Sequence, residues 1–469
     1  MEDPRAIETP EKPFRARMRL YLAVCAAYTA SFSFGVALSY SAPALPDIRK
    51  RMSFTTSDND WFGAFVSIGA TVGGLIGGNL ISYAGRKGAI LISSVGFALG
   101  YLLIEAIPVV GVMFAGRALT GVAMAINSLS VPAFIAEISP PESRGTLAVL
   151  SAVSASLGIL YMYVLGKWLD YRWLAVSAIA PTVVTTLSMT WVAESPRWLF
   201  QIGKRTESRE AFSFYRDSDE HEEFSTFVQS VSNAEQMTVR MLKEPHIYKP
   251  FFCALFCMAI QPFSGIVILL FYAHDIFESA GSSLAAADCT IVLGIVQLPG
   301  VLLSSALIDR FGRKVLFLSS IALVCVALAI MGVYLHLKTD NPSGLSAYGW
   351  VPLVVLCFYM FVYCIGIGPL PWVLLSEIMP LSVKVIGTGI ATTVNFAVGA
   401  IAAREYNSMI GLLGNDGIYW FYSAVMGATF VIILFFIPET KGKTLEEIEV
   451  LFGRQYVVPS NADLGSTDN

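Results

Sequence analysis

Long apolar runs alternate with short polar segments along the whole chain. Each run holds the roughly 20 mainly apolar residues that a helix needs to cross a bilayer. The period-two alternation of a membrane β-barrel is absent from the sequence. The pattern therefore predicts an all-α membrane protein with twelve transmembrane helices, at roughly residues 20–42, 60–82, 88–108, 110–134, 146–167, 172–193, 249–278, 286–308, 315–337, 349–375, 386–410 and 417–437.

One long polar interruption divides these runs into two sets of six. Its scattered phenylalanines among charged residues suit short amphipathic helices. We expect five parts: a cytoplasmic N-terminus at 1–19, an N-terminal six-helix bundle at 20–196, an intracellular helical linker at 197–248, a C-terminal six-helix bundle at 249–440 and a cytoplasmic tail at 441–469.

Three charged motifs recur in the two halves, in the same order and at nearly the same separation. The pairs are Gly85-Arg86-Lys87 with Gly312-Arg313-Lys314, the segment Glu137 to Arg144 with the segment Glu377 to Lys384, and Glu194 with Glu439. Such repetition indicates a duplicated unit. Two helical bundles related by an internal repeat are typical of transporters.

Composition agrees with a membrane protein and excludes several other classes. The 469 residues are 55% hydrophobic and 14% charged, whereas soluble domains are about one quarter charged. The net charge of −4 gives no reason to expect nucleic acid as a partner. The seven cysteines show no metal-ligand spacing, and we expect neither a metal nor a cofactor. No phosphate-binding glycine loop and no nucleophile–base pattern is evident, so we do not expect an enzyme.

The distribution of Lys and Arg predicts the orientation of the chain. If the N-terminus is cytoplasmic, 23 of the 31 basic residues fall on cytoplasmic segments, as the positive-inside rule requires. The cluster Arg49-Lys50-Arg51 would then lie outside, against the rule. We expect a multi-pass protein of the plasma membrane with both termini cytoplasmic, although an intracellular membrane remains an alternative.

Several motifs together resemble one known family. They are Gly116-Arg117, Glu137 to Gly145, Glu194 to Arg197, Gln261 to Gly265, Asp309 to Lys314, Gly368 to Trp372 and Pro438 to Thr444. Over about residues 20–452 the chain resembles the sugar porter family of the major facilitator superfamily. It is most similar to animal facilitative glucose transporters and insect facilitated trehalose transporters. The resemblance implies two pseudo-symmetric six-helix halves that transport a sugar by alternating access.

The resemblance also implies a charge latch that closes the cytoplasmic side. Acids and bases at a membrane boundary are expected to pair, because each is costly alone. The implied members are Arg86, Glu137, Arg144, Glu194, Arg197, Asp309, Arg313, Glu377, Lys384 and Glu439. The first half departs from the pattern, since Ser82-Tyr83 stands where the second half has Asp309-Arg310. A role limited to anchoring helix ends is the alternative.

Polar and aromatic residues inside the apolar runs of the second half predict the sugar site. The candidates are Gln261, Ser264, Gln297, Trp372, Thr393, Asn395 and Phe396. The resemblance implies sugar contacts for Gln261, Gln297, Trp372 and Asn395. Interhelical hydrogen bonding or packing is the alternative for each.

Four expected polar positions of the family pocket are changed in this chain, to Ala152, Pro262, Val267 and Cys364. The identity of the sugar, a hexose or a trehalose-like disaccharide, is therefore left open. Glycine and proline interrupt two helices, and we expect gating by Phe271, Tyr272, Pro369 and Pro371. A static kink is the alternative.

The function predicted from the sequence is a facilitative uniporter of a sugar. The first run carries no acid around Phe34 that would bind a coupled proton. A proton-coupled sugar symporter, a non-transporting sugar sensor and a carrier of another solute remain alternatives. The expected partners are the small sugar and the lipid bilayer, and the oligomeric state is left open.

Overall fold

The structure is a computed structural model. It describes residues 11–52, 54–140, 143–216, 224–225, 227–228, 245–341, 344, 346–379, 384–443, 447 and 452. Within these ranges the chain is helical and contains no strand. This confirms the predicted all-α fold class.

The first half is built from long helices joined by short connections. They are α1 (Glu11–Ser39), α2 (Ser41–Arg51), α3 (Thr56–Ala106), α4 (Val110–Ile138), α5 (Arg144–Leu165) and α6 (Tyr171–Thr190). Two short helices follow at the end where α5 begins, α7 (Pro196–Gln201) and α8 (Arg205–Tyr215).

The second half repeats this plan with two interrupted helices. Its elements are α10 (Pro245–Phe263), α11 (Ile266–Ala280), α12 (Ala286–Phe311), α13 (Arg313–Asp340), a short 3₁₀ helix (Ser346–Tyr348), α14 (Val351–Ile365), α15 (Leu370–Ile378), α16 (Lys384–Arg404) and α17 (Tyr406–Phe436). The pairs α10–α11 and α14–α15 each continue one predicted span across a break.

Eleven helical segments of the described chain are long and apolar enough to cross a membrane. One of them, α3, has 51 residues, and a straight helix of that size would be roughly 76 Å long. The hydrocarbon core of a bilayer is about 30 Å thick. Gly85 has a non-helical backbone with φ of 82° inside α3, so the turn there separates two spans and accounts for the predicted twelve.

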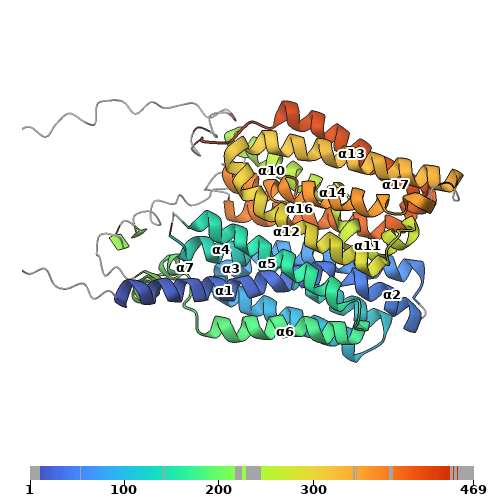
Figure 1. Ribbon diagram of the computed structural model, residues 1–469. Coiled ribbons are helices and arrows are strands. Elements are labelled where there is room, and N and C mark those ends of the chain that lie inside the picture. The colour runs from blue at the N-terminus through green and yellow to red at the C-terminus, as the bar shows by residue number, and fades with distance from the viewer. Residues whose placement is uncertain are drawn as a thin grey trace, which may run out of the picture.

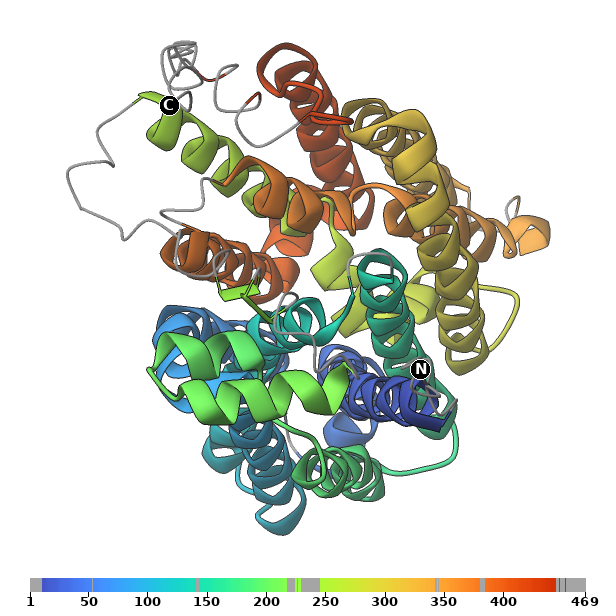
Figure 2. The same ribbon diagram turned by 90° about the vertical axis from the view of Figure 1, so that its left-hand side faces the viewer.

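The two halves lie side by side along their length. In Figure 1 the blue-to-green helices α1 to α6 fill the lower part and the yellow-to-red helices fill the upper part. The boundary is formed where α16 packs on α3 and α12 packs on α5. Figure 2 views the molecule from the end that carries α7, with the first half below and the second half above. Large apolar side chains such as Leu75, Leu187 and Phe435 are exposed, as expected for helices that face lipid.

Small residues allow close helix crossings within the first half. A Cβ added to Gly158 of α5 would lie 2.1 Å from the Phe32 carbonyl oxygen of α1, and one added to Gly35 would lie 1.8 Å from the Ala155 carbonyl oxygen. Backbones that approach this closely replace the hydrophobic effect as a source of helix association in lipid. The α1–α5 crossing therefore depends on glycine at both positions.

We predict that Gly158→Ala destabilises the protein by about 1–3 kcal/mol, because overpacking displaces a backbone that cannot yield. The melting temperature in detergent measures the effect. Gly111→Ala in α4 is the matched control, since nothing lies within 4 Å of its added Cβ. Equal melting temperatures for the two variants would contradict the prediction.

Candidate functional site

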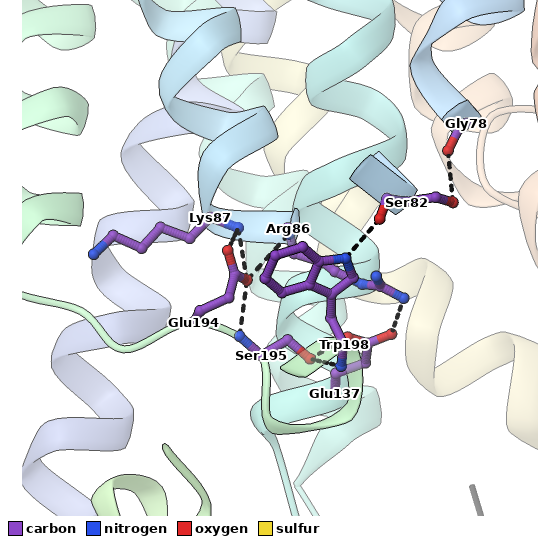
Figure 3. A network of polar contacts seen from close by, with 8 residues as sticks. All are labelled: Gly78, Ser82, Arg86, Lys87, Glu137, Glu194, Ser195 and Trp198. Carbon is purple, nitrogen blue, oxygen red and sulfur yellow. Dashed lines mark hydrogen bonds and ion pairs between the residues drawn. The ribbon is translucent and has the colours of Figure 1, made fainter. Parts of the chain in front are cut away.

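A cluster of charged and polar side chains surrounds the turn at Gly85 (Figure 3). Arg86 of α3 donates to Glu137 of α4 at 2.8 Å, and Glu137 also accepts from Ser195 Oγ. Glu194 accepts from the backbone N–H groups of Arg86 and Lys87 at 3.1 and 3.0 Å. The Glu194 carboxylate thus caps the free N–H groups where the second span of α3 begins, a position that favours negative charge. The carboxylate lies so close to the turn that a Cβ added to Gly85 would be 2.4 Å from Glu194 Oε2.

The second half repeats this cluster with its own residues. Arg313 of α13 donates to Glu377 of α15 through Nη2 at 2.8 Å and through Nε at 3.0 Å. Glu439 accepts from the backbone N–H groups of Arg313 and Lys314, each at 3.0 Å. Thr440 Oγ1 donates to the second oxygen of Glu377 at 2.7 Å, as Ser195 does to Glu137.

Backbone hydrogen bonds set the ionisation of Glu439. Partial burial alone would raise the pKa of this carboxyl group, but the N–H groups of Lys441, Arg313, Lys314 and Thr440 outweigh burial and hold the pKa below its ordinary value. Hydrogen bonds to the charged form of a carboxyl group have this effect. Glu439 is therefore held as a carboxylate where α13 begins.

Both clusters brace the half to which they belong. Their ion pairs join α3 to α4 and α13 to α15, so each connects helices of the same half. Arg144 is exposed and Arg197 is half-buried, and neither forms an ion pair with another described residue. The side chains of Asp309 and Lys384 lie outside the described part of the chain. Their membership of a latch between the halves stays a prediction.

Several polar side-chain contacts between the halves lie at the opposite end, where α2 and α11 lie in Figure 1. Asn407 of α17 donates to Asp60 Oδ1 of α3 at 2.6 Å. The Arg404 guanidinium lies 3.9 Å from Asp60 Oδ2 and stacks 4.7 Å from the centre of the Trp61 ring. Tyr272 OH lies 3.4 Å from the Asn59 carbonyl oxygen of α3 and 3.2 Å from the Ala403 carbonyl oxygen of α16. Side chains of both halves therefore close this end.

Two further ion pairs cross the same boundary. Arg49 of α2 pairs with Asp275 of α11, and Lys167 pairs with Asp288 of α12. His274, Asp275 and Glu278 bring three possible metal-ligand atoms within 4.8 Å of one another. The middle residue of this group, Asp275, is already paired with Arg49 in the contact between the halves.

Sequence reasoning missed the residues of this closure. Asp60 is only 3% exposed, yet it lies at the edge of a predicted span, where a solvated acid is the simplest interpretation. Arg404 and Asn407 lie near the end of another predicted span, far away in sequence. No local signal pairs them with Asp60, since the pairing depends on how the two halves pack.

Three predicted site residues come together where helices are interrupted. Gln261 at the end of α10 donates from Nε2 to the Gly368 carbonyl oxygen at 2.7 Å, between α14 and α15. Asn395 of α16 donates to Gln261 Oε1 at 2.8 Å and to the Met258 carbonyl oxygen at 2.7 Å. Ser264 Oγ donates to the Gln261 carbonyl oxygen at 2.7 Å. One amide cluster thus links both broken helices to α16.

Other predicted site residues lie at the boundary between the halves or in the packed interior. Gln297 of α12 donates to Ser156 Oγ of α5 at 3.1 Å. Thr393 of α16 faces Gly74 of α3, whose added Cβ would lie 2.7 Å from Thr393 Oγ1. Phe396 is buried. Trp372 is half-buried and packs on an apolar cluster that includes Met258 and Ala391.

The predicted gating residues lie beside the helix breaks. Gly265 adopts a left-handed backbone with φ of 88° between α10 and α11. Phe271 and Tyr272 of α11 are buried. Pro369 precedes α15 and Pro371 lies in its first turn, where proline costs no helical hydrogen bond. Gating by these four residues stays a prediction.

A buried arginine lies in the first half without an acidic partner. Arg117 is fully buried and donates to Ser41 Oγ at 2.8 Å and to the Ala37 carbonyl oxygen at 3.3 Å. Its guanidinium also lies 5.3 Å from the centre of the Phe62 ring. No carboxylate among the described residues forms an ion pair with it. This environment stabilises the cation through hydrogen bonds and aromatic faces.

Comparisons with known proteins agree with this architecture. The family model described as "Sugar (and other) transporter" matches residues 21–452. The chain is 34% identical to solute carrier family 2, facilitated glucose transporter member 8, of Mus musculus, over 96% of this chain and 99% of that one. It is 32% identical to the facilitated trehalose transporter Tret1 of Apis mellifera ligustica, and this match covers 95% of this chain and 90% of that one.

Solved structures show the same fold. The xylose transporter XylE from E. coli, in a partially occluded inward open conformation, superimposes with a TM-score of 0.76 at 22% identity. The match covers 91% of this chain and 100% of that one. The fold is therefore that of the major facilitator superfamily, as the sequence predicted.

We predict that Glu439→Gln lowers stability near neutral pH and that the deficit shrinks in acid. Because the pKa of Glu439 is held below its ordinary value, the folded state binds fewer protons than the unfolded state and stability rises with pH through this range. The contribution is complete above the ordinary carboxyl pKa and is lost as pH falls through the lowered one. Melting temperatures across pH measure it, with the exposed Glu210→Gln as control. A deficit that is independent of pH would contradict the prediction.

Proposed function

The chain belongs to the sugar (and other) transporter family, and on this premise we propose that it carries a sugar across a membrane by facilitated diffusion. The observation that carries the proposal is the cluster of Gln261 and Asn395 at two interrupted helices. Interrupted helices near the midplane are where transporters bind substrates and change shape. Relatives named as facilitated glucose and trehalose transporters support the same conclusion.

Alternating access follows from the uneven distribution of contacts between the halves. The end with Asp60, Tyr272 and Asn407 is closed by cross-half hydrogen bonds, while the charged clusters at the other end connect helices within each half. This distribution suits a carrier whose outer side is closed. In the opposite state the latch residues named above, Arg144 and Lys384 among them, would tie the cytoplasmic ends together. Phe271, Tyr272, Pro369 and Pro371 would serve as gating residues.

The surroundings of Arg117 favour uniport over proton coupling. A coupled proton needs a titratable acid in the spanning region, and an acid beside a buried arginine would be the natural place for it. Here Ser41 and the Ala37 carbonyl occupy the positions around the guanidinium. The buried Asp60 is instead engaged by Asn407 and Arg404 in the contact between the halves. Transport would then follow the sugar gradient alone.

The proposed substrate is a hexose or a trehalose-like disaccharide. Seven residues supply hydrogen-bonding groups and apolar surface suited to a sugar: Gln261, Ser264, Gln297, Trp372, Thr393, Asn395 and Phe396. A few polar groups on an otherwise apolar surface fix the orientation of a ligand. The chain is a multi-pass membrane protein. We place it in the plasma membrane with both termini cytoplasmic, and we assign residues 20–196 and 249–440 to the two bundles.

The proposal is tested by reconstituting the full chain in proteoliposomes with a panel of labelled hexoses and disaccharides. We expect equilibrative, saturable uptake of at least one sugar without acidification of the lumen. Uptake that acidifies the vesicles would replace the uniporter with a symporter. Sugar binding seen by tryptophan fluorescence without flux would indicate a sensor.

We predict that Asn407→Ala shifts the protein toward the outward-facing state. The variant leaves the buried Asp60 without its 2.6 Å donor, and an unsatisfied buried group costs about 1–3 kcal/mol. That cost corresponds to a shift of roughly 5- to 150-fold in the equilibrium. Spin labels at Val109 of the first half and Leu284 of the second half, in a cysteine-replaced background, measure the distance between the two halves at this end. The control Glu405→Gln changes a neighbouring exposed carboxylate. Identical distance distributions in the variant and the wild type would refute the closure.

We predict that Trp372→Ala weakens sugar uptake while membrane insertion stays intact. An aromatic contact contributes about 0.5–1.5 kcal/mol beyond buried area, which corresponds to a roughly 2- to 10-fold rise in KM. Uptake kinetics in proteoliposomes measure the change. An unaltered KM and maximal rate would remove Trp372 from the site.

A further inference from the structure

One hydrogen bond between the two halves lies near the middle of their helices. Gln297 of α12 donates from Nε2 to Ser156 Oγ of α5 at 3.1 Å. Gln297 is 9% exposed and Ser156 is 2% exposed. The boundary between α5 and α12 is therefore polar at this depth, close to where the proposed function requires a sugar site.

The hydroxyl of Ser156 fixes the orientation of the Gln297 amide. Ser156 Oγ donates its single proton to the Ala152 carbonyl oxygen at 3.1 Å. A serine hydroxyl has one donor and two acceptor lone pairs, so toward Gln297 it can only accept. With the Ser156 proton on the Ala152 carbonyl, the amide turns its NH₂ group to Ser156, and the amide orientation is assigned from this hydrogen-bond network.

The other end of the same amide is left without a donor. Gln297 Oε1 is a buried atom and has no hydrogen-bond partner among the described residues. A buried acceptor without a partner carries a cost that a native structure rarely tolerates without a reason. A ligand that brings a hydroxyl proton would remove this cost.

We propose that Ser156 is a positioning residue that holds Gln297 as a hydrogen-bond acceptor, so that the carrier recognises one sugar hydroxyl through the proton which that hydroxyl donates. This inference rests on the proposed sugar transport. It adds a residue of the first half to a site predicted from the second half. It also defines what the substrate must offer at that point, which is a donor.

Deoxy and deoxyfluoro sugars distinguish a donated proton from an accepted one. A deoxy sugar lacks both functions at the altered carbon, whereas fluorine keeps a weak acceptor and cannot donate. If the site takes only a donor, the two analogues at one ring position lose affinity equally. The loss of one hydrogen bond predicts a weakening of about 2- to 10-fold.

Ser156→Ala removes the group that fixes the amide. The Gln297 amide is then free to turn and present NH₂ to the sugar, so the fluorinated analogue should bind about 2- to 10-fold better than the deoxy analogue at that position. Ser156→Thr keeps a hydroxyl and should restore the wild-type pattern. Ser154→Ala is the matched control, because Ser154 is on the same helix and donates to the Tyr28 carbonyl oxygen within its own half.

The experiment measures competition by deoxy- and deoxyfluoro-glucose at carbons 2, 3, 4 and 6 against uptake of the labelled accepted sugar. In the wild type, we expect one ring position at which the deoxy and the deoxyfluoro analogue compete equally poorly. In Ser156→Ala, and in no other variant, we expect the deoxyfluoro analogue to compete better than the deoxy analogue at that position. If fluorine rescues every position in the wild type, or if Ser156→Ala leaves the pattern unchanged, the inference is overturned. If Ser156→Ala does not fold, Ser156→Cys replaces it, because a thiol is a much weaker hydrogen-bond partner, and a wild type in which fluorine rescues every position still overturns the inference. Wild-type protein that takes up no sugar would instead remove the proposed function.

Discussion

The side chain of Gln261 holds together two helices that are each interrupted inside the bilayer. Breaking a helix releases backbone groups that water cannot reach there, and each of them needs a partner from the protein. Gln261 supplies one to the Gly368 carbonyl, while Asn395 in turn satisfies Gln261. The breaks in α10–α11 and α14–α15 are thereby coupled through a single amide cluster. A ligand group that forms hydrogen bonds with these amides would therefore also weaken the contacts that hold the two helix breaks.

Two different kinds of contact divide the molecule into rigid and separable parts. Within each half, glycine crossings and the paired clusters around Glu194 and Glu439 fix helices to one another. Across the boundary, α16 packs on α3 and α12 packs on α5, and side-chain hydrogen bonds of Asp60, Tyr272 and Gln297 and two ion pairs accompany this packing. Backbone packing is difficult to exchange, whereas hydrogen bonds between side chains can be replaced by water or ligand at modest cost. The boundary is therefore the part suited to move.

The sequence predicted the helices well because hydrophobic length is a local property. Even the division of α3 at Gly85 was expected from the polar break between two runs. Six of the acids and bases that the sequence singled out lie in the two charged clusters: Arg86, Glu137, Glu194, Arg313, Glu377 and Glu439. The sequence did not show that Arg86 pairs with Glu137 inside one half, rather than with an acid of the other half. Asp60 was missed because a single acid at the edge of a run gives no sign that it is buried against Asn407. Such pairings depend on tertiary packing, which periodicity does not encode.

The isolated arginine of α4 has a consequence for the electrical behaviour of the protein. The guanidinium of Arg117 is fixed in the first half and fully buried. When that half tilts relative to the bilayer, a positive charge is displaced through the membrane field, and a full crossing is equivalent to about 2.3 kcal/mol per 100 mV. A partial displacement scales this value down but does not remove it. The balance between the two facing states would then respond to voltage although the cargo itself is uncharged.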